Sequence, residues 1–81
     1  MMVRVRFFSY FRDLTGCDEM LLDMPDSATL GEVMSRVHTA HPKLRAMDRS
    51  TLTAVGLDYQ TRDYVIQPGD ELSLFPPVQG G

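Results

Sequence analysis

One amphipathic segment near the middle of the sequence constrains the fold more than any other feature. Within it, apolar residues recur at intervals of three and four, which places them along one face of a helix. These residues are Leu30, Val33, Met34 and Val37. Thr29 and Glu32 have the spacing of a capping box, and Pro42 forbids continuation of the helix. Because the apolar stripe is one-sided, we expect a helix over residues 30–40 that lies across a sheet.

Both ends of the chain show the two-residue period of a strand with one buried face. In segment 2–8 this alternation leaves Phe8 on the polar face, beside two arginines, and in segment 71–75 it leaves Phe75 pointing outward. The side chains predicted to face inward are Val3, Val5, Phe7, Leu72 and Leu74. The sequence therefore predicts two outward aromatic residues on strands that are far apart in the chain.

The remaining segments complete a mixed α+β pattern. They are a short helical segment at 9–15, a strand at 18–24, a loop or helical turn at 43–50, a strand at 51–57 and a short return strand within 58–63. A hairpin, a crossing helix and returning strands build a mixed sheet of four to five strands with one main helix across one face, which is the β-grasp (ubiquitin-like) arrangement. The first and last strands are predicted to be central neighbours.

The sequence ends in Phe75-Pro76-Pro77-Val78-Gln79-Gly80-Gly81, a stiff Pro-Pro step followed by two residues without side chains. We expect a domain at 1–77 and a flexible Gly-Gly tail at 78–81. Glycine lets another backbone or a ligand approach closely, and such a tail reaches roughly 18 to 20 Å from the last strand. The tail is predicted to present the α-carboxylate of Gly81 to another protein's active site; the alternative is a disordered tail with no function.

Composition narrows the possible functions. A chain of 81 residues forms one domain with a thin core, which argues against a self-contained enzyme and favours a binding or carrier module. A net charge of −3 disfavours binding to nucleic acid. No signal peptide and no apolar run long enough for a membrane span are visible, so we expect a cytoplasmic location.

The residues that most often carry chemistry do not form a convincing site. Cys17 is the single cysteine, and a small packing residue explains it better than a persulfide relay. His38 and His41 lie near the end of the predicted helix without a third ligand at metal spacing, so no metal site is predicted. Turn and strand-edge roles explain Asp70 and Glu71 better than acid–base catalysis does.

With these residues in view, the chain resembles the small subunit of molybdopterin synthase, a ubiquitin-like sulfur carrier, over nearly its whole length. The motifs that carry the resemblance are Val5-Arg6-Phe7-Phe8, Arg12-Asp13-Leu14-Thr15-Gly16, Thr53-Ala54-Val55, Gly69-Asp70-Glu71-Leu72 and the ending from Phe75 to Gly81. The ending is the specific part. Members of the family often have Asn where this chain has Gly56. The segment 57–62 is also unusually polar, and both differences bear on which partner the chain would bind.

The resemblance implies a function in molybdenum cofactor biosynthesis. A ubiquitin-activating-like adenylyltransferase uses ATP to form an acyl-adenylate on Gly81, and sulfur from a donor enzyme then replaces AMP to leave a thiocarboxylate, 1-thioglycine, next to Gly80. The sulfur passes to a cyclic pterin precursor held by the large synthase subunit, in a heterotetramer. The chain would then be no enzyme on its own and would hold no permanent cofactor.

The resemblance also assigns docking residues. It places Phe8, Tyr59 and Phe75 at a hydrophobic interface with the partner, and buried aromatic residues are frequent energetic anchors of interfaces. The tail residues Pro76, Pro77, Val78 and Gln79 continue that contact. Two alternatives stay open: a sulfur carrier for thiamine synthesis or tRNA thiolation, and a ubiquitin-like protein modifier.

Overall fold

The computed structural model describes residues 1–77 of the chain. The tail residues Val78, Gln79, Gly80 and Gly81, and with them the predicted boundary of the tail, lie outside the described residues. In chain order the elements are β1 (Met2–Phe7), α1 (Tyr10–Thr15), β2 (Glu19–Asp23), α2 (Leu30–Ala40), the 3-10 helix η1 (Pro42–Ser50), β3 (Leu52–Val55), β4 (Asp58–Tyr59) and β5 (Glu71–Phe75).

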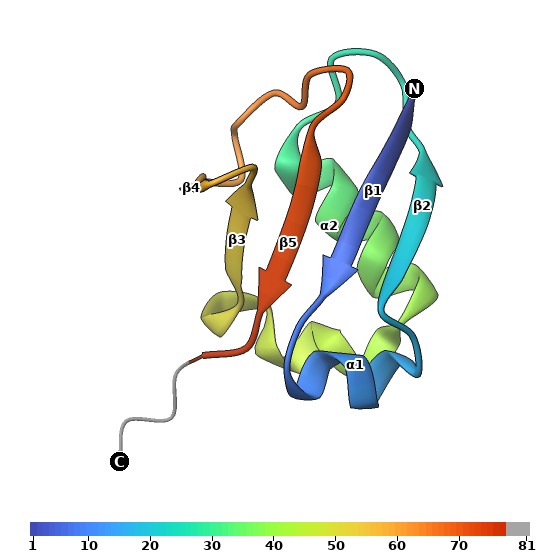
Figure 1. Ribbon diagram of the computed structural model, residues 1–81, viewed down its shortest axis with the longest axis vertical. Coiled ribbons are helices and arrows are strands. Elements are labelled where there is room, and N and C mark those ends of the chain that lie inside the picture. The colour runs from blue at the N-terminus through green and yellow to red at the C-terminus, as the bar shows by residue number, and fades with distance from the viewer. Residues whose placement is uncertain (78–81) are drawn as a thin grey trace.

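The five strands form one mixed sheet in the order β2-β1-β5-β3-β4. The terminal strands β1 and β5 are parallel neighbours at its centre, and the other pairs are antiparallel. Figure 1 shows α2 crossing behind β1 and β5, which leaves the other face of the sheet uncovered by that helix. The predicted β-grasp fold and the central position of the two terminal strands are confirmed.

The helix α2 begins and ends where the sequence predicts. The Thr29 side chain accepts a hydrogen bond from the Glu32 N–H at 3.2 Å, and the Glu32 carboxylate accepts one from the Thr29 N–H at 3.4 Å, which completes the capping box. The stripe of the helix is buried against the inner face of the sheet. The buried residues are Leu30, Val33, Met34 and Val37 from the helix and Val3, Val5, Phe7, Leu72 and Leu74 from β1 and β5.

The segment after α2 is more regular than the sequence predicts. Residues 42–50 form the nine-residue 3-10 helix η1, where the polar sequence indicated a loop or a helical turn. Pro42 ends α2 but occupies the first turn of η1, a position that proline tolerates because its missing N–H would be unpaired there anyway. Leu44 is buried and Met47 packs against the core, so two side chains tie η1 to it.

Two glycines set the turns beside β3 and β5. Gly56 has φ +60, so the strand predicted at 51–57 stops at Val55, and Leu57 is fully exposed in the turn that follows. Asparagine is among the residues that tolerate this left-handed backbone, so it could occupy position 56 without changing the turn. Gly69 has φ +88 in a turn closed by a bond of 3.0 Å from the Asp70 N–H to the Gln67 carbonyl, as the sequence predicts.

Candidate docking face

The uncovered face of the sheet brings together the outward side chains of β1, β5, β3 and β4. In the strand register Leu52 lies opposite Phe75, and Ala54 lies opposite both Ser73 and Tyr59, so these residues share that face. Strand β5 ends at Phe75 and continues into Pro76, and the apolar side chains of this face gather at that end. We call the set Phe8, Leu52, Tyr59, Phe75, Pro76 and Pro77 the docking face.

The two outward aromatic residues predicted from the sequence form one stacked pair. The ring centroids of Phe8 and Phe75 are 4.7 Å apart, and the ring planes differ by 16°. The Phe8 N–H donates to the Leu74 carbonyl at 3.2 Å, which extends the contact of β1 with β5 by one residue. Both side chains are half-buried, so each keeps surface for a partner.

A groove of about 490 Å³ runs beside this pair. Its lining consists of Ser9, Tyr10, Leu52, Tyr59, Phe75, Pro76 and Pro77. Tyr59 is 69% exposed and Leu52 is 38% exposed, so large apolar surface faces solvent there. The described residues of the predicted interface are thereby placed on one face, next to the base of the tail.

Two features of this face were not predicted from the sequence. Arg6 lies with its guanidinium carbon 5.3 Å from the centroid of the Phe8 ring, and its Nη1 pairs with the Glu71 carboxylate at 3.4 Å. Ser9, which follows Phe8, has φ 56 and ψ −137 and makes no side-chain cap on α1. A positive φ is uncommon for a residue with a side chain and marks local backbone strain. The period-two alternation places Arg6 and Phe8 on one face, but it does not indicate the contact between them or the pair with Glu71, and no motif signals the backbone of Ser9.

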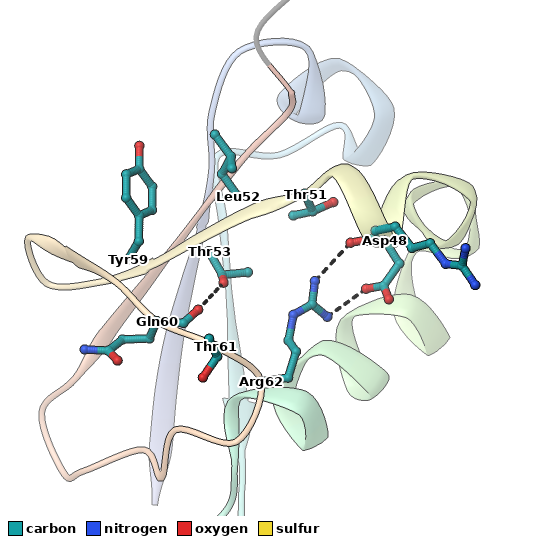
Figure 2. A pocket seen from close by; sticks show the side chains of 9 residues that line it. Asp48, Thr51, Leu52, Thr53, Tyr59, Gln60, Thr61 and Arg62 are labelled. Atoms are coloured by element: carbon teal, nitrogen blue, oxygen red, sulfur yellow. Dashed lines mark hydrogen bonds and ion pairs between the residues drawn. The ribbon is translucent and has the colours of Figure 1, made fainter.

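A second cleft, of about 450 Å³, shares Tyr59 and Leu52 with this groove, and Figure 2 shows the side chains that line it. Several of its polar side chains, among them Arg62 and Thr53, bond to groups within the chain. Arg62 donates to the Asp48 side chain at 2.8 Å and to the Asp48 carbonyl at 3.0 Å. The hydroxyl of Thr53 donates to the Gln60 carbonyl at 2.9 Å. The contacts of Arg62 brace η1 against the segment after β4, and the contact of Thr53 ties the same segment to β3, so we interpret this cleft as structural.

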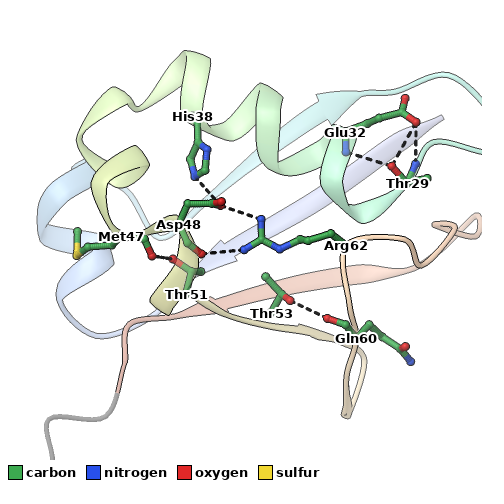
Figure 3. Close-up of polar contacts among 9 residues, drawn as sticks. All are labelled: Thr29, Glu32, His38, Met47, Asp48, Thr51, Thr53, Gln60 and Arg62. Atoms are coloured by element: carbon green, nitrogen blue, oxygen red, sulfur yellow. Dashed lines mark hydrogen bonds and ion pairs between the residues drawn. The ribbon is translucent and has the colours of Figure 1, made fainter.

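His38 extends that bracing to α2, as Figure 3 shows. Its buried Nε2 lies 3.5 Å from the Asp48 carboxylate. Burial lowers the pKa of His38 from 6.5; the nearby Asp48 opposes the shift, whereas Arg62 and Arg45 add to it. His41 instead packs its ring edge on Phe7, with centroids 5.5 Å apart. Within residues 1–77 no three His, Cys, Asp or Glu side chains cluster closely enough to hold a metal ion.

The acidic pair before the last strand has partners inside the chain. Asp70 accepts hydrogen bonds from the Gln67 N–H at 2.8 Å and from the Tyr64 hydroxyl at 2.9 Å, and the second contact raises the pKa of Tyr64. Glu71 pairs with Arg6. The predicted turn and strand roles of Asp70 and Glu71 are confirmed.

The half-buried Cys17 packs against the core, as expected for a small side chain. Neither of the α-helices described here is both long and apolar enough to cross a membrane.

Three comparisons with known proteins agree with this geometry. The molybdopterin synthase sulfur carrier subunit of Escherichia coli (strain K12) is 34% identical over 82 residues, covering 99% of this chain and 100% of that protein. SAMP1 from Haloferax volcanii has a TM-score of 0.87 at 24% identity, covering 100% of both chains. A chain in the complex of subunits 1 and 2 of the molybdopterin-converting factor from Helicobacter pylori 26695 has a TM-score of 0.70 at 24% identity, again covering 100% of both chains.

The two structures, at this level of identity, establish the shared fold. The sequence comparisons go further, because the model of the ThiS family matches residues 5–81, which is nearly the entire chain. The chain therefore belongs to the ThiS family, as a full-length relative of the molybdopterin synthase sulfur carrier subunits.

Proposed function

We propose that this chain carries sulfur for molybdopterin synthesis on Gly81. The observation that carries the proposal is the placement of the docking face. The half-buried, stacked pair of Phe8 and Phe75 lies at the end of the central strand β5, and the residues that follow Phe75 are Pro76 and Pro77. A central strand is held by neighbours on both sides. The docking face and the start of the tail thus share one rigid base.

The chemistry begins at the carboxylate of Gly81. A carboxylate is ionised at neutral pH and is a poor electrophile. In the proposed sequence, an adenylyltransferase joins this carboxylate to AMP from ATP and releases pyrophosphate. Sulfide supplied by a donor enzyme then attacks the acyl carbon, the bond from that carbon to the phosphate oxygen of AMP breaks, AMP leaves, and Gly81 carries a thiocarboxylate. Gly80, which has no side chain, lets the tip enter a narrow active site.

The second half of the proposal concerns the partner. The thiocarboxylate sulfur is transferred to a cyclic pterin precursor inside the large subunit of molybdopterin synthase. That subunit supplies the binding and acid–base groups, whereas this chain supplies only sulfur. The existence of a complex between subunits 1 and 2 of the Helicobacter pylori factor, whose small chain shares this fold, supports such an assembly. Phe8, Tyr59 and Phe75 are the proposed contacts, with Pro76, Pro77, Val78 and Gln79 leading into the active site.

Mass spectrometry of the intact protein tests the assignment of Gly81. Protein produced in a host with the cofactor pathway should contain a fraction heavier by the difference between one sulfur and one oxygen atom. Deletion of Gly81 should remove that fraction, and the Lys43→Ala variant, altered at an exposed position of η1, should keep it. If the heavier fraction persisted without Gly81, the terminal glycine would not be the carrier site.

Capture of the partner tests the pathway. The full chain should retain the large subunit of molybdopterin synthase from an extract. Retention of a thiazole synthase or a tRNA-thiolating enzyme instead would assign the chain to another sulfur pathway, and isopeptide adducts on lysines of other proteins would identify a modifier.

A further inference from the structure

We propose that Arg6 is a positioning residue that holds the Phe8–Phe75 pair in the arrangement that docks onto the partner. The inference rests on the proposed function, because it concerns the same docking face. Phe8 is the first residue after β1, so its side chain is not fixed by an interior place in a strand. A docking anchor at such a position gains affinity when its bound arrangement already exists in the free protein.

The contacts of Arg6 fit this role. Its guanidinium lies over the Phe8 ring at 5.3 Å from the centroid, within the range of cation–π attraction. The guanidinium is also held by the pair of its Nη1 with the Glu71 carboxylate on the neighbouring strand, at 3.4 Å. Phe8 in turn stacks on Phe75 at 4.7 Å. A chain of contacts therefore runs from Glu71 through Arg6 and Phe8 to Phe75, linking β5 to β1 and back to β5.

The backbone restrains Phe8 from the opposite direction. Ser9 follows it directly with φ 56 and ψ −137, and a side-chain-bearing residue keeps such a conformation only where its surroundings enforce it. Strain of this kind concentrates at binding sites and switch regions. Phe8 is thus restrained by the side chain of Arg6, which precedes it in the sequence, and by the backbone of Ser9, which follows it.

Arg4 provides a matched control within the same strand. It lies two residues before Arg6 on the same exposed face of β1, and its side chain is 52% exposed, against 47% for Arg6. It also makes a comparable ion pair, with Glu19 at 3.5 Å. A cation–π contact distinguishes Arg6 from Arg4, because Arg6 is the only arginine within residues 1–77 that makes such a contact. A difference between variants of Arg4 and Arg6 consequently isolates the contact with Phe8.

The test measures binding to the large subunit of molybdopterin synthase for Arg6→Gln, Arg4→Gln and Arg6→Lys. Loss of one cation–π contact should weaken affinity about threefold to tenfold for Arg6→Gln. Arg4→Gln should change affinity less than about twofold, as expected for an exposed ion pair. Arg6→Lys should restore part of the loss, because an ammonium keeps the charge but lacks the planar guanidinium.

A second readout reports on the free protein. The NMR signals of the Phe8 and Phe75 ring protons should shift in Arg6→Gln and stay in place in Arg4→Gln, because only Arg6 contacts the pair. A residue that merely stabilises the sheet would lower the midpoint of unfolding without moving these signals selectively. Both arginine variants should lower that midpoint by similar small amounts.

Phe8→Ala and Phe75→Ala separate this inference from the proposed docking face. If both weaken binding while Arg6→Gln behaves like Arg4→Gln, the docking face stands and the role of Arg6 is wrong. If neither phenylalanine variant weakens binding, the proposal that this face docks onto the partner is wrong, and so is the proposed role of Arg6. If both weaken binding and Arg6→Gln follows them with the ring shifts, the positioning role is supported.

Discussion

Phe7 and Phe8 are consecutive and chemically identical, yet they belong to opposite faces of the sheet. Phe7 is 1% exposed and packs in the core beneath α2, whereas Phe8 stacks on Phe75 on the uncovered face. The same division holds on β5, where Leu74 is buried and Phe75 is half-buried. The two-residue period of a strand thus lets two short segments supply both the core and the docking face.

The comparison teaches that hydrophobicity alone does not distinguish a core residue from a contact residue here. Phe7 is buried in the core and contributes to the free energy of folding, whereas we propose that Phe8 and Phe75 contribute mainly to binding. If this division is correct, substitutions on the two faces should separate the effects on unfolding from the effects on docking.

The largest expected effect is on the inner face. Phe7→Ala should lower the free energy of unfolding by about 3–5 kcal/mol, because it removes a fully buried ring and leaves a cavity. Chemical denaturation measures this loss. Phe7→Leu, which keeps most of the volume, should cost less than about 1.5 kcal/mol and allows docking to be measured on folded protein. A large loss of affinity in the folded Phe7→Leu variant would contradict the claim that the inner face serves folding and the outer face serves docking.

The next effect is on the outer face. Phe75→Ala should weaken binding to the large synthase subunit by about 2 kcal/mol or more, which is roughly thirtyfold or more, as for a central interface aromatic. Its free energy of unfolding should fall by only about 1 kcal/mol, the value of one aromatic pair. Isothermal titration calorimetry measures the loss of binding free energy, and chemical denaturation measures the loss of unfolding free energy. Ser73→Ala, on the same face of β5 away from the aromatic pair, is the control. A Phe75→Ala protein that binds normally would contradict the proposed interface.

Much of this division could be predicted from the sequence, because period-two alternation in β1 and β5 and period-3.6 spacing in α2 are local signals. The alternation correctly predicted that Phe8 and Phe75 point outward, and the order of the elements, interpreted as a β-grasp, correctly predicted that the two terminal strands are neighbours. They could not predict that the two rings stack, since stacking depends on the parallel register of strands more than sixty residues apart in the chain.

The features that were missed share a dependence on tertiary contacts. The backbone of Ser9 is left-handed although serine does not favour that region. The regular turns of η1 are secured through buried Leu44 and through Asp48, which meets Arg62 and His38 from distant parts of the chain. Residue type and spacing carry no information about such partners.

The helix that covers the inner face offers a smaller test of the same comparison. Thr29→Ala removes the capping box of α2 and should lower the free energy of unfolding by about 1 kcal/mol. Thermal or chemical unfolding measures the change, and docking of the folded protein should be unaffected. Thr39→Ala serves as the control in the same helix: its hydroxyl bonds back to the Ser35 carbonyl at 3.0 Å, and alanine is the better helix former. Equal losses in the two variants would argue against the cap as the cause.

The smallest expected effect is a pH dependence of the free energy of unfolding, caused by His38 on the side of the sheet that α2 covers. Its pKa is lowered in the folded protein by burial, against the influence of Asp48 and with that of Arg62 and Arg45. The unfolded chain therefore takes up a proton near pH 6.5, before the folded protein does. Stability should consequently fall as the pH drops below 6.5 and level off beneath the lowered pKa, with a slope of at most about 1.4 kcal/mol per pH unit.

Denaturation at a series of pH values above and below 6.5 should reveal this slope in the unmodified protein. His38→Gln should remove the contribution, and His41→Gln, which retains His38, should keep it. Affinity of the folded protein for the large subunit should not follow the same curve, because His38 lies under η1 and away from Phe8 and Phe75. If docking tracked the protonation of His38, the two faces would be coupled, and the separation between core and contact residues would have to be abandoned.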